Sequence, residues 1–280
     1  MNFSTFSTKK DDATLTVTLN YGDVNMMSAT MVAELFSLVG QLTIDTSTRV
    51  VVFESANTDF FVAHFDINDI LKLIDGDPTI PVSKSKDLNI LQALGLSLNS
   101  LPQVTIAKVD GICRGGGFEM MLAMDMCFAT EHSKFCFPEV SAGFLPSGGG
   151  STLLPLKVGS ARALEIMLTA RDFSGAEAGL YNVVNKVFSN SEQLDDYVKS
   201  TVAYMSTNSL ASIQGVKSVL KQTMSGFKNG LFSGLAQENT VMEQCFSNPK
   251  TIQTLRLLAD NTGAVEQELE LVNTIRTLVN

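Results

Sequence analysis

The order of strand-like and helix-like segments constrains the fold of this chain most strongly. Residues 14–19 (Thr-Leu-Thr-Val-Thr-Leu) alternate polar and apolar side chains, a pattern that predicts a half-buried strand. The predicted strands are 14–19, 50–53, 104–109, 126–130, 134–137 and 183–188. After about residue 190 only helical spacing remains. This order predicts an α/β core, which we place at residues 1–200, followed by a C-terminal helical region at 201–280.

Helices are predicted wherever apolar residues recur with a period of three to four. Ser28 is placed to cap the first helix, and Ser174 with Glu177 has the spacing of a capping box. The predicted helices are 28–42, 67–75, 87–101, 118–124, 151–156, 160–170, 191–206, 208–226, 230–246, 249–260 and 263–279. We interpret residues 76–86 as a surface loop and 111–117 as a glycine-rich turn.

Charge and hydropathy exclude several classes of protein. The chain has 280 residues and a net charge of −9, which argues against binding to nucleic acid or to an anionic membrane surface. No apolar run approaches the roughly 18 residues that a membrane span needs. The first twelve residues lack the apolar core of a signal peptide, so we expect a cytoplasmic protein with its four cysteines reduced.

The small number of histidines narrows the possible chemistry. Only His64 and His132 are present, so a three-histidine metal site is impossible. The His-Glu-x-x-His, Gly-x-Ser-x-Gly and Walker A motifs are all absent. We therefore expect any catalysis to depend on carboxylates and backbone dipoles, with no metal and no redox cofactor.

A run of three glycines, Gly115-Gly116-Gly117, lies between a predicted strand and an apolar helix. Glycine lets a ligand approach the backbone closely, and the start of a helix presents unpaired N–H groups. Such a position can hold an oxygen that becomes anionic during a reaction. A tight turn required only for packing is the alternative interpretation.

Two glutamates are candidate acid–base residues. Glu119 is predicted in the first turn of the apolar helix, where its neighbours would raise its pKa, although it could simply complement the helix dipole. Glu139 follows Pro138 and by itself is typical of an ordinary loop glutamate.

Taken together, the motifs resemble those of the enoyl-CoA hydratase/isomerase family, also called the crotonase superfamily, over roughly residues 13–190. The matching segments are Gly115-Gly116-Gly117-Phe118-Glu119 with Asp125, Phe135-Cys136-Phe137-Pro138-Glu139, Gly143 to Gly150, Gly159 to Ala163 and, with shifted spacing, Ala176 to Val184. The resemblance implies a spiral of ββα units. It also implies a C-terminal helical region that forms homotrimers, or dimers of trimers.

The resemblance also implies a site for an acyl-CoA thioester, in which coenzyme A is part of the substrate. The backbone N–H groups of Phe65 and Gly116 would form the oxyanion hole. The residues expected to line the substrate around them are Ala63, His64, Asp66, Gly115, Gly117, Pro138 and Gly143. Glu119 and Glu139 would hold a water molecule and add it across the 2,3 double bond. Isomerisation, decarboxylation and a non-catalytic acyl-CoA-binding subunit remain alternatives.

Several residues depart from the family pattern. His64 replaces a glycine and could alter the turn at Phe65, approach the thioester, or be only a surface imidazole. Thr152-Leu153 replaces a Gln-Arg pair, and Gly22 or Asp23 stands where a phosphate-binding lysine is common. Lys84 and Lys86 are possible substitutes for that lysine. The 17 phenylalanines and 12 methionines indicate either a roomy apolar pocket or ordinary core packing.

Overall fold

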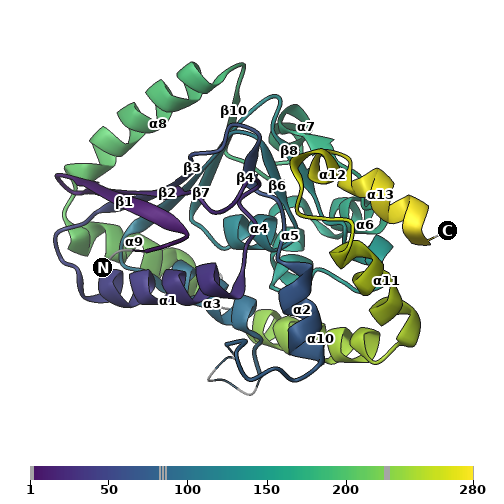
Figure 1. Cartoon of the computed structure of the whole chain (residues 1–280). Helices are drawn as coiled ribbons and strands as arrows, with labels where there is room; N and C mark the ends of the chain where they lie inside the picture. The colour runs from purple at the N-terminus through teal and green to yellow at the C-terminus, as the bar shows by residue number, and fades with distance from the viewer. Residues whose placement is uncertain (1–2, 82, 84, 86, 224–227, 280) are drawn as a thin grey trace.

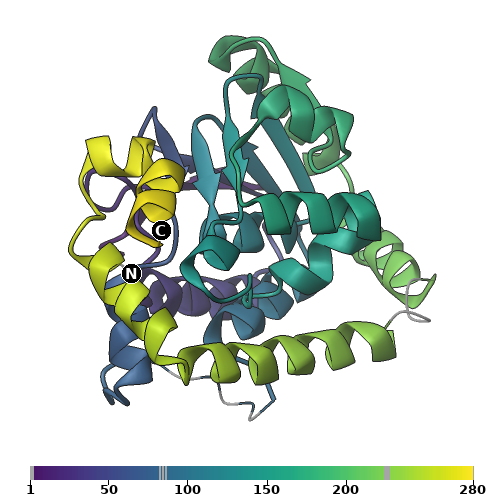
Figure 2. The same cartoon turned by 90° about the vertical axis from the view of Figure 1, so that its right-hand side faces the viewer.

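A computed structural model describes residues 3–81, 83, 85, 87–223 and 228–279 (Figures 1 and 2). Its larger sheet has six strands in the order β1-β2-β3-β5-β7-β10. These are β1 (Phe6–Asp11), β2 (Thr14–Leu19), β3 (Val50–Ser55), β5 (Val104–Val109), β7 (Met126–Thr130) and β10 (Lys186–Phe188). The β1–β2 pair is antiparallel, and every other neighbouring pair is parallel.

A smaller sheet has the order β4-β6-β8-β9. Its strands are β4 (Phe60–Val62), β6 (Ile112–Arg114), β8 (Lys134–Cys136) and β9 (Phe173–Ser174). The consecutive pairs β3–β4, β5–β6 and β7–β8 each place one strand in each sheet, and a helical segment follows each pair. The chain therefore winds as the predicted spiral of ββα units, and the small sheet ends close to the start of helix α4.

Helices cover both sheets. Those of the first 190 residues are α1 (Ala29–Ile44), α2 (Ile67–Ile74), α3 (Ile90–Ser100), α4 (Gly115–Leu122), the 3₁₀ helix η1 (Glu139–Ala142), α5 (Gly150–Val158), α6 (Ser160–Thr169) and α7 (Gly175–Leu180). The Ser28 hydroxyl accepts a hydrogen bond from the Met31 amide, and Ser174 with Glu177 forms a complete capping box. Both predicted caps are confirmed.

The C-terminal helices are α8 (Ser191–Ser206), α9 (Leu210–Thr223), α10 (Lys228–Phe246), α11 (Pro249–Ala259), α12 (Val265–Leu269) and α13 (Leu271–Val279). The proposed boundary at residue 200 falls inside α8. Helix α10 runs along the lower edge of Figure 2 and leads into α11, which packs against α2. The last helices therefore return to the core and lie close to its small sheet.

Several boundary predictions were wrong. Strands β1, β4, β6 and β9 were not predicted, and β4, β6 and β9 are only two or three residues long, too short to show a period. The predicted turn at 111–117 contains β6, and α4 already begins at Gly115, so Glu119 lies beyond the first helical turn. Residues 183–185 lie outside β10, and the predicted helix 263–279 is broken between α12 and α13.

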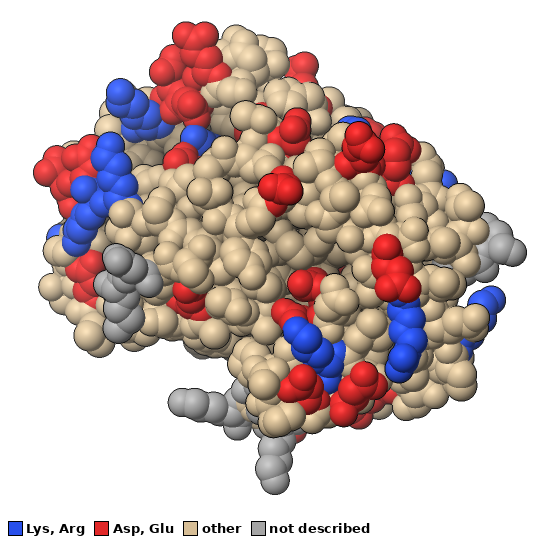
Figure 3. All heavy atoms as spheres, in the orientation of Figure 1, with Lys and Arg blue, Asp and Glu red and all other residues tan. Residues whose placement is uncertain are grey.

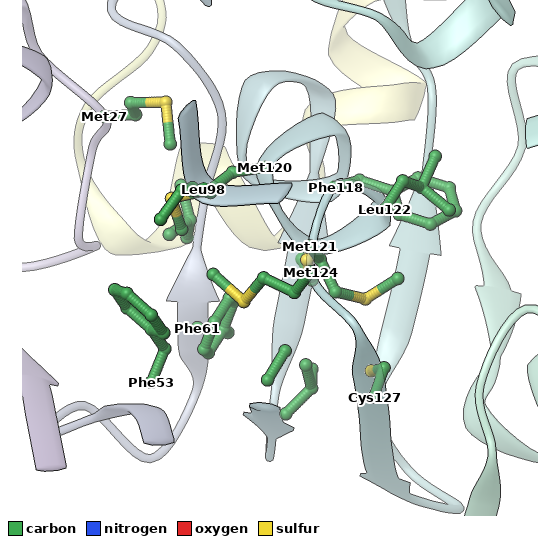
Figure 4. Close-up of a cluster of buried hydrophobic side chains, with 14 of the residues drawn as sticks. Met27, Phe53, Phe61, Leu98, Phe118, Met120, Met121, Leu122, Met124 and Cys127 are labelled. Carbon is green, nitrogen blue, oxygen red and sulfur yellow. The ribbon is translucent and has the colours of Figure 1, made fainter. Parts of the chain in front are cut away.

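The main hydrophobic core accounts for many of the phenylalanine and methionine residues. Figure 4 shows part of it, where Phe53 and Phe61 lie near Met121 of α4 and near Met124. The Phe118 ring stacks on Phe137 with a centroid separation of 4.4 Å. Core packing thus fixes the helix that carries Glu119.

The outer surface shows small groups of acidic and basic side chains around a broad uncharged area on the face of Figure 3. Within the described ranges, no helix is both long enough and apolar enough to cross a membrane.

Candidate active site

A cavity of about 100 Å³ lies where α2, α3, α4 and η1 meet the C-terminal helices. It has two different ends. One end holds Phe65, Gly116, Glu119 and Glu139. The other end is walled by apolar side chains: Ile67, Ile70, Leu73, Phe144, Phe246, Leu255, Leu258, Leu271 and Ile275. The cavity therefore joins a region with two carboxyl groups to an apolar compartment.

Glu119 is held at the polar end by the glycine run that precedes α5. Its Oε1 accepts hydrogen bonds from the Gly148 amide at 2.7 Å and from the Gly150 amide at 2.9 Å. The side chain is buried, and burial together with the charge of Glu238 raises the pKa of Glu119 to about 8, despite the two amides. A carboxyl group with this pKa can exchange a proton near neutral pH.

Glu139 lies on the same cavity wall, in the first turn of η1 directly after Pro138. Among the residues that the structure describes, none hydrogen-bonds its buried Oε2. Burial and the nearby Glu119 carboxylate raise the pKa of Glu139 well above its usual value. The two glutamates therefore share one site but have unlike surroundings.

Glu238 is a third buried carboxylate behind Glu119. It reaches the glycine run from α10 and accepts hydrogen bonds from the Gly149 amide and the Gln92 side chain, each at 3.0 Å. The Thr152 hydroxyl also donates to it. Glu238 thus holds the middle amide of the run while the amides on either side hold Glu119.

The backbone at Phe65 and Gly116 is arranged to leave two amides available. The Met27 amide donates to the His64 carbonyl, and the Asp66 amide donates to the Met27 carbonyl, each at 2.9 Å. In this parallel pattern the N–H of Phe65 points away from Met27. Gly116 is the second residue of α4, so its amide has no intrahelical acceptor.

The glycine run at the start of α4 allows close packing at this point. A Cβ atom on Gly116 would lie 3.2 Å from the Phe65 Cβ, which shows how closely the two backbones approach. A Cβ on Gly117 would lie 2.4 Å from the Val62 Cβ, and one on Gly115 would lie 2.8 Å from Glu139 Oε1. Side chains at these positions would push the two walls of the site apart.

Not every predicted substrate-binding residue lies on the cavity wall. Those that do line the cavity are His64 and Pro138, together with the four residues at the polar end. Gly115 and Gly117 lie beside the wall, Ala63 is buried in a small core cluster, and Asp66 caps α2 through the Asn68 amide. Gly143 has a φ of +92° and packs against Thr251.

His64 is buried, so its interpretation as a surface imidazole was wrong. Its side chain is 7% exposed, and Nε2 lies 3.1 Å from the Glu268 carboxylate. Burial opposes the charged imidazole, but Glu268 outweighs this effect and raises the pKa of His64 above its usual value.

The structure also shows the contacts of the Thr152-Leu153 pair, which is another departure from the family pattern. Thr152 binds Glu238, and Leu153 packs against the main core. Lys84 and Lys86 lie outside the described residues. Within the described ranges, no cluster of three or more His, Cys, Asp or Glu side chains could hold a metal ion.

Sequence reasoning missed three buried charged residues close to the site, which are Glu238, Glu268 and Arg114. The first two lie on C-terminal helices, beyond the motifs, where a glutamate between helical residues is typical of a solvated face. Arg114 stands directly before the glycine run, and its charge in an otherwise apolar strand was the one available signal.

Comparison with known proteins identifies the family. A family model described as enoyl-CoA hydratase/isomerase matches residues 9–256. YngF of Bacillus subtilis (strain 168), provisionally named an enoyl-CoA hydratase/isomerase, is 26% identical over 95% of this chain and 98% of its own. The human enoyl-CoA hydratase domain-containing protein 2, mitochondrial, is 31% identical over 61% of this chain, which spans 56% of that protein.

A solved structure agrees with this assignment. The crystal structure of a Streptomyces avermitilis protein, provisionally described as an enoyl-CoA hydratase, is 32% identical to this chain. It superimposes with a TM-score of 0.89 and covers 99% of both chains. The predicted α/β fold is therefore confirmed.

Proposed function

Because the chain belongs to the enoyl-CoA hydratase/isomerase family, we propose that it adds water across the 2,3 double bond of an enoyl-CoA thioester. The observation that carries this proposal is the pair of buried glutamates in one cavity, held in opposite hydrogen-bonding environments. A protein that only bound acyl-CoA would have no chemical need for two costly buried carboxyl groups.

In this proposal the thioester oxygen lies between the amides of Phe65 and Gly116. Conjugate addition moves negative charge onto that oxygen, so fixed donors stabilise the transition state more than the ground state. One such donor is worth about 3 kcal/mol. The acyl chain extends into the apolar compartment, and coenzyme A enters as part of the substrate.

The surroundings support a different role for each glutamate in this proposal. Two amides favour the carboxylate form of Glu119, which therefore takes a proton from the attacking water. The water oxygen bonds to C3, and the π electrons of the double bond move to form an enolate. Glu139, which is kept protonated by burial and by Glu119, gives its proton to C2 and collapses the enolate. A proton then passes from Glu119 to Glu139 and restores the pair.

The direct test uses purified protein with crotonyl-CoA and longer 2-enoyl-CoAs. Hydration would remove the ultraviolet absorbance of the conjugated thioester, and in D₂O it would place deuterium at C2. Glu119→Gln and Glu139→Gln should each lower kcat by about 100-fold or more. Glu243→Gln, on the exposed face of α10, is the matched control and should keep full activity.

Three other results would reject hydration, and each of them would indicate a different function. Conversion of a 3-enoyl to a 2-enoyl thioester without hydration would indicate an isomerase. Release of CO₂ from a malonyl-type thioester would indicate a decarboxylase. Acyl-CoA binding by calorimetry with no turnover at any chain length would indicate a non-catalytic subunit.

We also propose that the chain assembles as a trimer or a dimer of trimers. Val216, Val219 and Leu220 on α9 are each at least 60% exposed and form an apolar stripe suited to burial between subunits. Sedimentation equilibrium of the purified chain tests this, and a monomer at micromolar concentration would reject it.

A further inference from the structure

We infer that Glu268 is a positioning residue that fixes both amides of the proposed oxyanion hole from the C-terminal end of the chain. The inference rests on the proposed function, because it assigns Glu268 a role in that same site. Glu268 is on α12 and is fully buried, although it lies 129 residues after Glu139 in the sequence.

The first link passes through His64, the residue before Phe65. The His64 Nε2 hydrogen-bonds the Glu268 carboxylate at 3.1 Å, and its Nδ1 lies 2.8 Å from the carbonyl oxygen of Phe65. Both ring nitrogens are therefore engaged, one with the C-terminal helix and one with the peptide that follows the oxyanion amide. This arrangement fixes the rotation of the Phe65 backbone.

The second link passes through Arg114, two residues before Gly116. This guanidinium is 0% exposed, and its Nη1 donates to the main-chain carbonyl of Glu268 at 2.5 Å. Its other nitrogens form a bidentate pair with Asp172, at 2.8 and 2.6 Å. A buried bidentate arginine is rigid, so it anchors the end of β6 from which α4 starts.

Glu268 therefore contacts the chain segments on both sides of the proposed oxyanion hole, His64 through its carboxylate and Arg114 through its main-chain carbonyl. Glu268 is itself held, because its Oε1 accepts a hydrogen bond from the Gly263 amide at 2.8 Å. The positive charges of Arg114 and His64 are balanced by the nearby negative charges of Asp172 and Glu268. A glycine at position 64, as in the family pattern, would have no side chain to make the first link.

The physical consequence is preorganisation of the two donors. An oxyanion hole stabilises charge only if its amides are held in place before the charge develops. A displacement of about 1 Å can cost about 100-fold in rate, even when the cause is distant from the reacting atoms. Loss of Glu268 should therefore slow the chemical step more than it weakens substrate binding.

The test compares Glu268→Gln with Glu266→Gln, an exposed glutamate on the same short helix. The first variant should lower kcat by about 10- to 100-fold with a much smaller change in KM, and the control should change neither. Binding of acetoacetyl-CoA gives a second readout. A working oxyanion hole favours its enolate, whose ultraviolet absorbance should decrease in Glu268→Gln and stay unchanged in the control.

A double-mutant cycle separates positioning from general stability. If Glu268 acts through His64, then His64→Gly should slow the reaction by a similar factor, and adding Glu268→Gln should change kcat by less than about twofold more. Equal effects of Glu268→Gln with and without His64 would overturn the inference. His64→Gly also provides the measurement if Glu268→Gln does not fold.

The failures of the two proposals can be told apart. If the wild-type protein does not favour the acetoacetyl-CoA enolate, then the oxyanion hole itself is rejected, and the role of Glu268 with it. If the wild-type protein favours the enolate and Glu268→Gln does so equally, then only the positioning role is rejected.

Discussion

The two ends of the cavity are built by different physical means. At the polar end, amides of Gly148 and Gly150 hold Glu119, and a glycine run lets Gly116 approach Phe65. At the apolar end, Leu255 and Leu258 of α11 pack against side chains of α2 and η1. The polar end thus depends on backbone geometry, whereas the apolar end depends on the volume of side chains.

This difference predicts how the two ends respond to change. Backbone hydrogen bonds are directional, so a small displacement at the polar end should remove activity. Hydrophobic packing is non-directional, so changes at the apolar end should alter stability and acyl preference more than the rate of chemistry. Three substitutions and one pH profile can test this contrast.

Gly148→Ala should disturb the geometry of the polar end without removing either carboxyl group. Its Cβ would lie 2.4 Å from Glu119 Oε2 and 2.9 Å from the Leu91 Cβ, so the carboxylate must move. We expect kcat to fall by about 100-fold. Gly215→Ala on α9 meets nothing within 4 Å and should leave activity unchanged. Equal activity of the two variants in a steady-state hydration assay would contradict the assigned position of Glu119.

The pH profile should report the raised pKa of Glu119. Because the proposed base acts as a carboxylate and its pKa is about 8, kcat/KM should rise about tenfold per pH unit on the acid side of that value. Glu238→Gln removes a nearby negative charge that raises the pKa of Glu119, so it should shift this acid limb of the pH profile to lower pH. A limb near pH 4.5 in the wild-type protein would show that Glu119 is not the base.

Leu258→Ala tests the apolar end. Leu258 is 1% exposed, so its truncation should cost about 2–5 kcal/mol of unfolding free energy. We expect turnover of crotonyl-CoA to change by less than about tenfold, while longer acyl chains gain relative to short ones. Leu257→Ala, 39% exposed on the same helix, is the control for thermal unfolding. A larger loss of crotonyl-CoA turnover than in Gly148→Ala would contradict the contrast.

Glu139→Gln, besides lowering kcat, should change the pH dependence of stability, and this change is the smallest effect expected here. The pKa of Glu139 is raised in the folded protein, so this group stabilises the fold fully below about pH 4.5 and loses that contribution as pH rises through the folded-state pKa. Glutamine at this position does not titrate, so the variant does not lose stability in this way. Its Tm relative to the wild-type protein should therefore increase by a few degrees between pH 5 and pH 9 in scanning calorimetry. A constant difference would contradict the raised pKa.

The polar end was predicted mainly from the family resemblance. Local patterns alone singled out the glycine run and Glu119, whereas Phe65, Gly116 and Glu139 were chosen because their motifs match the family, and the structure brings all four residues to one cavity. Their catalytic roles remain predictions. Local patterns were less informative about β4 and β6, because strands of three residues are defined by their neighbours in the sheet rather than by their own periodicity.

The order of strands and helices in the sequence was enough to predict an α/β core. Its motifs of glycines and glutamates at fixed spacing were enough to indicate the family, which in turn implied the ββα spiral and the residues proposed for the reaction centre. Only the tertiary structure decided what surrounds that centre. Glu238, Glu268 and the apolar side chains of α11 and α13 come from a region where helical periodicity reveals a buried face but not its partner. Which helix covers which face is set by packing between distant segments, and no local pattern encodes it.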